Sequence, residues 1–84
     1  MTRTEIFQQI QDALVEQFEI DRGKITLEAH LIKDLGMDSL DAIQMAVHIQ
    51  ELTKQRVAEE QMRQLRTVQD VIEMIERLLA SQAK

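Results

Sequence analysis

Several residue types are missing or scarce in this chain of 84 residues. It has no cysteine, proline, tryptophan or tyrosine, and only two glycines and two phenylalanines. Without cysteine the chain can form no disulfide and no thiolate metal site, and it has no thiol nucleophile of its own. Residues that favour helices dominate instead, which predicts an all-α fold.

Long hydrophobic runs and an excess of positive charge are also lacking. No run of 18 apolar residues and no basic-then-apolar leader occurs, so we expect a cytoplasmic protein without membrane insertion. The formal net charge of −5 opposes binding to the phosphate backbones of nucleic acids. An acidic surface favours protein partners with basic docking patches.

The length of the chain limits its architecture. We expect one domain spanning residues 1–84, in a monomeric protein with a thin core. Such a core leaves little room for a deep, dry active site assembled from several loops. The length therefore disfavours a self-contained enzyme.

The spacing of apolar residues predicts three longer amphipathic helices, over residues 3–18, 39–54 and 68–81. A short helical segment is expected near residues 59–65. Thr2 and Glu5 have the spacing of a capping box at the first helix start. In the second helix the apolar stripe is expected to consist of Leu40, Ile43, Ala46, Val47, Ile49 and Leu52.

The long connection over residues 19–37 is not a polar linker, because apolar residues are scattered through it without a clean period. A loop this apolar is expected to lie over the core, and loops of this length are usually functional. The predicted fold is a small bundle of three main helices plus a short third helix, with a long apolar loop between helices one and two.

The stretch "DLGMDSLD", residues 34–41, is the main candidate site. Gly36 allows the backbone to turn tightly, Asp38 is a suitable N-cap, and Asp41 places a negative charge in the first helical turn. Two interpretations of Ser39 remain open. It is a helix cap in an unmodified helical interaction module, or it is a hydroxyl that another enzyme modifies at a helix N-terminus that favours phosphate esters.

Self-catalysis and metal binding have little support in the sequence. A nucleophilic serine needs a nearby base, but the chain has only His30 and His48 and no G-x-S-x-G sequence. A calcium loop starting at Asp34 would need glycine and glutamate where Ser39 and Met45 stand. We therefore expect no catalytic residues and no metal site, while Met37 and Met45 could contact a flexible ligand.

The same stretch resembles the phosphopantetheine attachment motif of acyl carrier proteins, D-L-G-x-D-S-L. The order of helices, including a last helix that begins in "TVQDVIEMI", also resembles that family over roughly residues 3 to 80. The resemblance implies that Ser39 carries 4′-phosphopantetheine, installed from coenzyme A by a phosphopantetheinyl transferase, with Gly36, Asp38 and Leu40 around it. It implies a carrier of acyl thioesters and not an enzyme.

The resemblance also implies that the helix beginning at Ser39 is recognised by partner enzymes. Those partners would be ketosynthases and enzymes of the acyltransferase or acyl ligase type. The exposed positions that would contact them are Asp38, Leu40, Asp41, Gln44, Val47, His48 and Glu51.

The sequence departs from the common fatty-acid type of carrier at several positions. Gln44 and Gln50 stand where that type usually carries glutamate, and Lys54 and Arg56 follow just beyond. The aromatic residue usual near the end of the helix is also missing. These departures favour a specialised carrier with less basic partners. The cargo stays open among fatty acyl, polyketide and aryl or aminoacyl groups, although Met37 before Asp38 is more typical of acyl than of peptidyl carriers.

Overall fold

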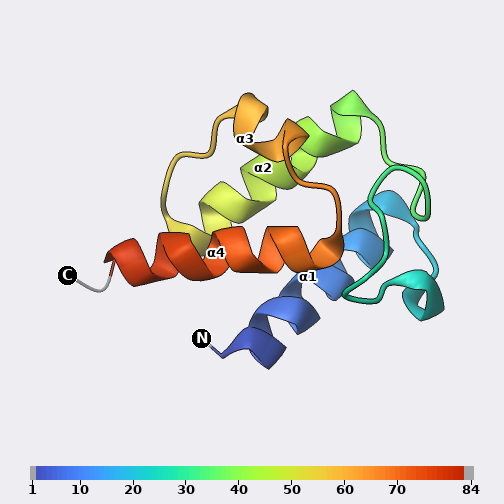
Figure 1. The fold of residues 1–84 in the computed structure, drawn as a ribbon, viewed down its shortest axis with the longest axis horizontal. Coiled ribbons are helices and arrows are strands. Elements are labelled where there is room, and N and C mark those ends of the chain that lie inside the picture. Colours follow the sequence, from blue (N-terminus) through green and yellow to red (C-terminus); the bar gives the residue numbers. More distant parts are fainter. Residues whose placement is uncertain (1, 83–84) are drawn as a thin grey trace.

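The computed structural model describes residues 2–82, and within them the chain forms four α-helices and one turn of 3-10 helix (Figure 1). No strand forms among these residues. The predicted all-α fold and the predicted order of helices are confirmed, and the connection contains one short helical turn. The elements are α1 (Arg3–Phe18), η1 (Arg22–Lys24), α2 (Ser39–Thr53), α3 (Glu59–Arg63) and α4 (Val68–Gln82).

The helices enclose one core around α4. In Figure 1, α4 runs along the length of the molecule, with α2 above it and α1 below it, and α3 lies beside α2. The apolar faces predicted for α1 and α4 point into this core, because their periodic residues are buried or packed against it. Fully buried side chains include Ile6, Ile10, Leu14, Met45, Ile49, Val68, Val71, Ile72 and Ile75.

Reciprocal side-chain caps start the three longer helices. At α1, Thr2 Oγ1 accepts from the Glu5 backbone N–H at 3.2 Å and Glu5 Oε1 accepts from the Thr2 N–H at 3.0 Å. The same exchange joins Thr67 and Asp70 at α4. These pairs satisfy amides that the first helical turn leaves without partners, so they define where each helix begins.

The loop between α1 and α2 lies over the core, as predicted. The side chains of Leu31 and Leu35, both in this loop, are buried in the core. The Leu31 N–H donates to the Arg66 carbonyl at 2.9 Å, and the Val68 N–H donates to the Ala29 carbonyl at 3.1 Å. These bonds connect the loop to the start of α4. They fix the position of the loop just before the chain enters α2.

The apolar stripe predicted for α2 is wrong in part. Leu40 is 69% exposed, Ile43 41% and Val47 47%. Met45 and Thr53 are buried with Ala46 and Ile49. The hydrophobic residues of α2 lie on two faces, and apolar spacing alone does not show which face meets α4.

Side-chain hydrogen bonds hold the segment between α2 and α3. The Val57 N–H donates to Gln50 Oε1 at 2.9 Å, and the Gln55 side-chain amide donates to the Leu78 carbonyl of α4. Buried Thr53 donates its hydroxyl to the Ile49 carbonyl at 2.8 Å. These hydrogen bonds fix the turn between the two helices, so that α3 packs alongside α2.

Candidate functional site

Ser39 is the first residue of α2, and its side chain is exposed. Gly36 precedes it with a φ of 70°, in the left-handed region that glycine tolerates best. In this turn the Gly36 N–H donates to the Ile32 carbonyl at 3.0 Å, and the Met37 N–H donates to the Leu31 carbonyl at 3.0 Å. Backbone hydrogen bonds within the loop therefore close this turn, and Ser39 follows it at the surface.

Asp38, and not Ser39, caps α2. Asp38 Oδ1 accepts from the Asp41 N–H at 3.0 Å, and Asp41 Oδ2 accepts from the Asp38 N–H at 3.2 Å. The interpretation of Ser39 as the helix cap is wrong, because the neighbouring carboxylate already makes that bond. Over residues 2–82 no hydrogen bond engages the Ser39 hydroxyl, and the cap leaves the amides of Ser39 and Leu40 for another acceptor.

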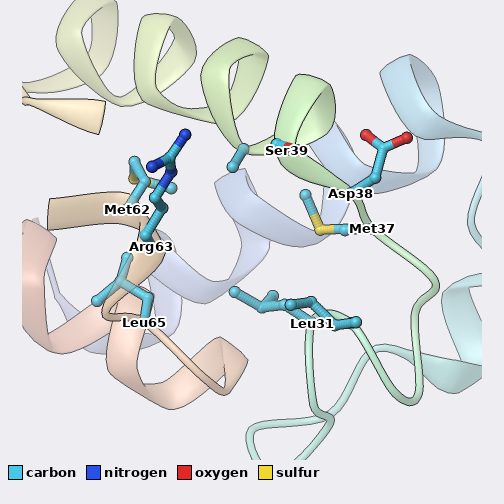
Figure 2. A pocket seen from close by; sticks show the side chains of 9 residues that line it. Leu31, Met37, Asp38, Ser39, Met62, Arg63 and Leu65 are labelled. Carbon is cyan, nitrogen blue, oxygen red and sulfur yellow. The ribbon is translucent and has the colours of Figure 1, made fainter. Parts of the chain in front are cut away.

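A pocket of about 430 Å³ opens beside Ser39, between the loop, the start of α2, and α3 (Figure 2). Most of its lining is apolar. Figure 2 shows Leu31 and Met37 on the loop side, and Met62 and Leu65 on the side of α3. The complete lining is Leu31, Ile32, Met37, Asp38, Ser39, Ala42, Met62, Arg63 and Leu65.

The positions implied for partner recognition do not all share one environment. Leu40, Gln44, Val47 and Glu51 are exposed, as the resemblance implies. Asp41 is half-buried, and its carboxylate accepts the Asp38 N–H in the capping box.

His48 departs most from the expected exposure. It is half-buried, and its Nε2 is buried with no hydrogen-bond partner among the described residues. The expected full exposure of His48 is therefore wrong, while its contact with a partner stays a prediction. Met37 lines the pocket, whereas Met45 is fully buried in the core and is not among the residues that line it.

Within the part of the chain that the structure describes, no group of three or more histidine, aspartate or glutamate side chains is placed to hold a metal ion. No helix among these residues is long and apolar enough to cross a membrane.

Comparison with known proteins places this site in a family. The family described as "Phosphopantetheine attachment site" matches residues 8–75. Acyl carrier protein 2 of Ralstonia nicotianae is 43% identical over 81 residues, which cover 96% of this chain and 100% of that protein. The acyl carrier protein of Phytoplasma mali is 41% identical over 84% of both chains. That of Coprothermobacter proteolyticus is 34% identical over 90% of this chain and 93% of its own length.

The chain belongs to the acyl carrier proteins. It is a carrier and not an enzyme, and its cofactor is covalently bound 4′-phosphopantetheine. Proteins of this family work with phosphopantetheinyl transferases and biosynthetic enzymes. The residues beside the pocket fit this group. The exposed Ser39 hydroxyl can form the phosphodiester, and the two amides at the start of α2 can bind the phosphate.

Several pocket residues were not singled out from the sequence as site residues. Leu31, Met62, Arg63 and Leu65 come from the loop and from the region of α3, eight or more positions from Ser39 along the chain. Each looks like a core or surface residue by its local pattern. The packing of α3 against α2 and the course of the loop bring them next to the serine, so no local signal could have identified them.

Proposed function

We propose that this protein holds acyl intermediates as thioesters on a phosphopantetheine arm attached to Ser39, and shuttles them between partner enzymes of fatty acid, polyketide or related specialised biosynthesis. One observation carries the proposal. Ser39 presents an exposed, unbonded hydroxyl at a helix start that Asp38 already caps, directly beside an apolar pocket.

Ser39 Oγ is the proposed nucleophile in the loading reaction. It forms a bond to the phosphate of coenzyme A that bears pantetheine, and the bond to the adenosine bisphosphate leaving group breaks. The transferase takes the hydroxyl proton, since no base of this chain is hydrogen-bonded to Ser39 among the described residues. The amides of Ser39 and Leu40 then favour the negative charge of the ester.

When bound, phosphopantetheine supplies the thiol that this cysteine-free chain lacks. The pocket beside Ser39 shields the cargo from water, because Leu31, Met37 and Met62 offer it an apolar surface. Gly36, Asp38 and Leu40 shape the attachment site. This arrangement suits acyl groups, while the identity and length of the cargo are open.

The exposed face of α2 is the proposed docking surface for the transferase, for a ketosynthase and for an acyltransferase or acyl ligase. Leu40 and Val47 provide apolar contacts beside the arm, with Asp41, Gln44 and Glu51 around them. His48 can contribute only through its exposed part. The glutamine at position 44 and the cations Lys54 and Arg56 support a specialised pathway with less basic partners.

The proposal also covers the domain organisation, oligomeric state and location of the protein. Residues 1–84 form a single carrier domain that acts as a monomer in the cytoplasm. Light scattering of the apo and loaded protein tests the monomeric state, and a dimer would contradict it.

The intact mass of the purified protein tests the attachment site. Wild type is expected to gain one phosphopantetheine after incubation with coenzyme A and a broad-specificity transferase, and Ser39→Ala none. Ser81→Ala, which changes the other serine of the sequence, is the matched control and should gain the same mass as wild type. A folded, unmodified wild type that gains no mass would contradict the proposal and leave an unmodified interaction module as the alternative.

A further inference from the structure

Arg63 is the one cation among the nine residues that line the pocket beside Ser39. Six of the others are apolar, and Ser39 is the attachment residue. Asp38, the remaining residue, already accepts the Asp41 N–H at 3.0 Å. Arg63 is therefore the only positive charge on the pocket lining, although it also takes part in an interaction within the chain.

The fold holds Arg63 at the edge of this pocket. It is the last residue of α3 and is exposed, while its neighbour Met62 is only 3% exposed and anchors the short helix in the core. Figure 2 shows the Arg63 side chain extending from α3 toward α2, on the side of the pocket opposite Met37 and Asp38.

The charges around Ser39 favour an anion that turns toward Arg63. Asp38 and Asp41 lie in the first turn of α2 with Ser39, and both carry carboxylates. An arm attached to Ser39 adds a phosphodiester, a further negative charge beside them. Repulsion from the two carboxylates and attraction by the guanidinium act in the same direction, across the mouth of the pocket.

We propose that Arg63 binds an oxyanion on the arm of Ser39 and thereby positions the arm along the pocket between α2 and α3. The oxyanion is either the phosphodiester of the arm or a carboxylate at the far end of the cargo. The planar guanidinium matches both groups with paired N–H donors. The inference rests on the proposed function, because it requires an arm on Ser39.

Two properties of Arg63 determine how the inference is tested. It already takes part in another interaction within the chain, and its five donors allow it to hold an oxyanion as well. It is also exposed, so the contact contributes little to stability and weakens with salt. The informative measurement is therefore spectroscopic.

The experiment uses the full chain loaded from coenzyme A, octanoyl-coenzyme A and glutaryl-coenzyme A, with loading verified by intact mass. Phosphorus NMR follows the phosphodiester, and nitrogen-15 NMR follows the arginine side-chain Nε–Hε groups. The variants are Arg63→Gln, Arg63→Lys and the matched control Arg66→Gln. Arg66 lies three positions on and does not line this pocket, so its substitution removes the same charge elsewhere.

We expect Arg63→Gln to shift the phosphorus resonance, Arg66→Gln to leave it in place, and Arg63→Lys to retain most of the wild-type position. Moderate salt should move wild type toward Arg63→Gln. A difference in all three loaded forms identifies the phosphodiester as the bound group. A wild-type Arg63 Nε–Hε shift confined to the glutaryl form identifies the cargo carboxylate.

Equal spectra for Arg63→Gln and Arg66→Gln in every loaded form, with no Arg63 Nε–Hε shift on loading, would overturn the inference. Circular dichroism confirms that each variant is folded. A protein that gains no mass at Ser39 would instead overturn the proposed function, so the two failures are distinguishable.

Discussion

The adjacent residues Asp38 and Ser39 differ in their hydrogen bonding at the start of α2. The aspartate makes the capping bonds of α2, and the serine hydroxyl stays unbonded and exposed. A single residue that both capped the helix and carried an arm would lose its capping bond on modification. An ester on Ser39, as proposed above, would therefore leave the capping bonds of α2 intact.

The stability of variants at these two positions tests the division. We expect Asp38→Ala to lower the free energy of unfolding by about 1 kcal/mol, as is typical for loss of an N-cap. Ser39→Ala should change it by less than about 0.5 kcal/mol, as for a surface position without such a role. Urea denaturation followed by circular dichroism measures both, and a larger loss for Ser39→Ala would show that the serine is the structural residue.

Gly36 is a second residue whose type follows from its backbone. We expect Gly36→Ala to destabilise the protein by about 1 kcal/mol, because an L-residue is disfavoured at a φ of 70°. The cost is purely one of backbone conformation, since an added Cβ would meet no atom within 4 Å. Gly23→Ala is the matched control.

At Gly23 a Cβ would lie 3.5 Å from Asp21 Oδ1, an ordinary contact, and the φ there is not positive. This variant should be as stable as wild type or slightly more so. Thermal or urea denaturation compares the two variants, and equal losses would contradict the backbone explanation.

At the scale of the element, α2 has one face in the core and one exposed face that carries apolar residues. Ile49 is completely buried, while Val47, two positions earlier, is 47% exposed. Both are β-branched aliphatic residues, and sequence pattern assigned both to one stripe. The structure separates a buried face, which packs in the bundle, from an exposed face, which is the proposed docking surface.

Truncation of one side chain on each face distinguishes the two faces. Ile49→Val removes one buried methylene and should cost about 1 kcal/mol of unfolding free energy. Val47→Ala should stay within about 0.5 kcal/mol of wild type, and it should slow loading by the transferase if this face is the docking surface. Denaturation and loading kinetics measure the two effects, and a stability loss at Val47 would place it in the core.

The capping box of α1 is expected to make the stability of the protein depend on pH. The pKa of the Glu5 carboxyl lies below its ordinary value, first because the carboxylate accepts the Thr2 backbone N–H and then because of the Thr2 side chain. A lowered folded-state pKa stabilises the protein above the unfolded pKa, and this contribution is lost as pH falls through the folded pKa. NMR titration of Glu5 should show the lowered pKa in wild type.

Thr2→Ala should raise the Glu5 pKa toward the ordinary value, because it removes the part of the lowering that comes from the Thr2 side chain. An unchanged pKa in this variant would assign the whole effect to the backbone N–H.

At the scale of the whole molecule, net charge and local charge differ. The chain is acidic overall, but its cations Lys54 and Arg56 follow directly after α2, and position 44 is neutral. Charge steering by this surface should be weaker than that of a uniformly acidic one.

The salt dependence of transferase binding tests this charge pattern. We expect the affinity of the apo protein to fall only modestly from low to moderate salt, since screening acts on few charge pairs. Replacing Gln44 and Arg56 by glutamate should make the fall steeper for a transferase with a basic surface. A steep fall with the wild-type chain would count against less basic partners.

The order of elements and the attachment stretch follow from local rules that the sequence alone contains. Helix formers, 3–4 spacing and short capping pairs such as Thr2 with Glu5 act within one or two turns, so the helix boundaries could be predicted closely. The DLGMDSLD stretch is contiguous, so the candidate serine could be recognised without knowledge of the fold.

Tertiary structure decided which apolar face of α2 is buried, that His48 turns Nε2 inward, and that Arg63 and Met62 reach the pocket beside Ser39. These features depend on contacts between α2, α3, α4 and the loop, which are distant in the chain. Burial is a property of the assembled bundle, and a residue's own neighbours in sequence do not determine which helix will cover it.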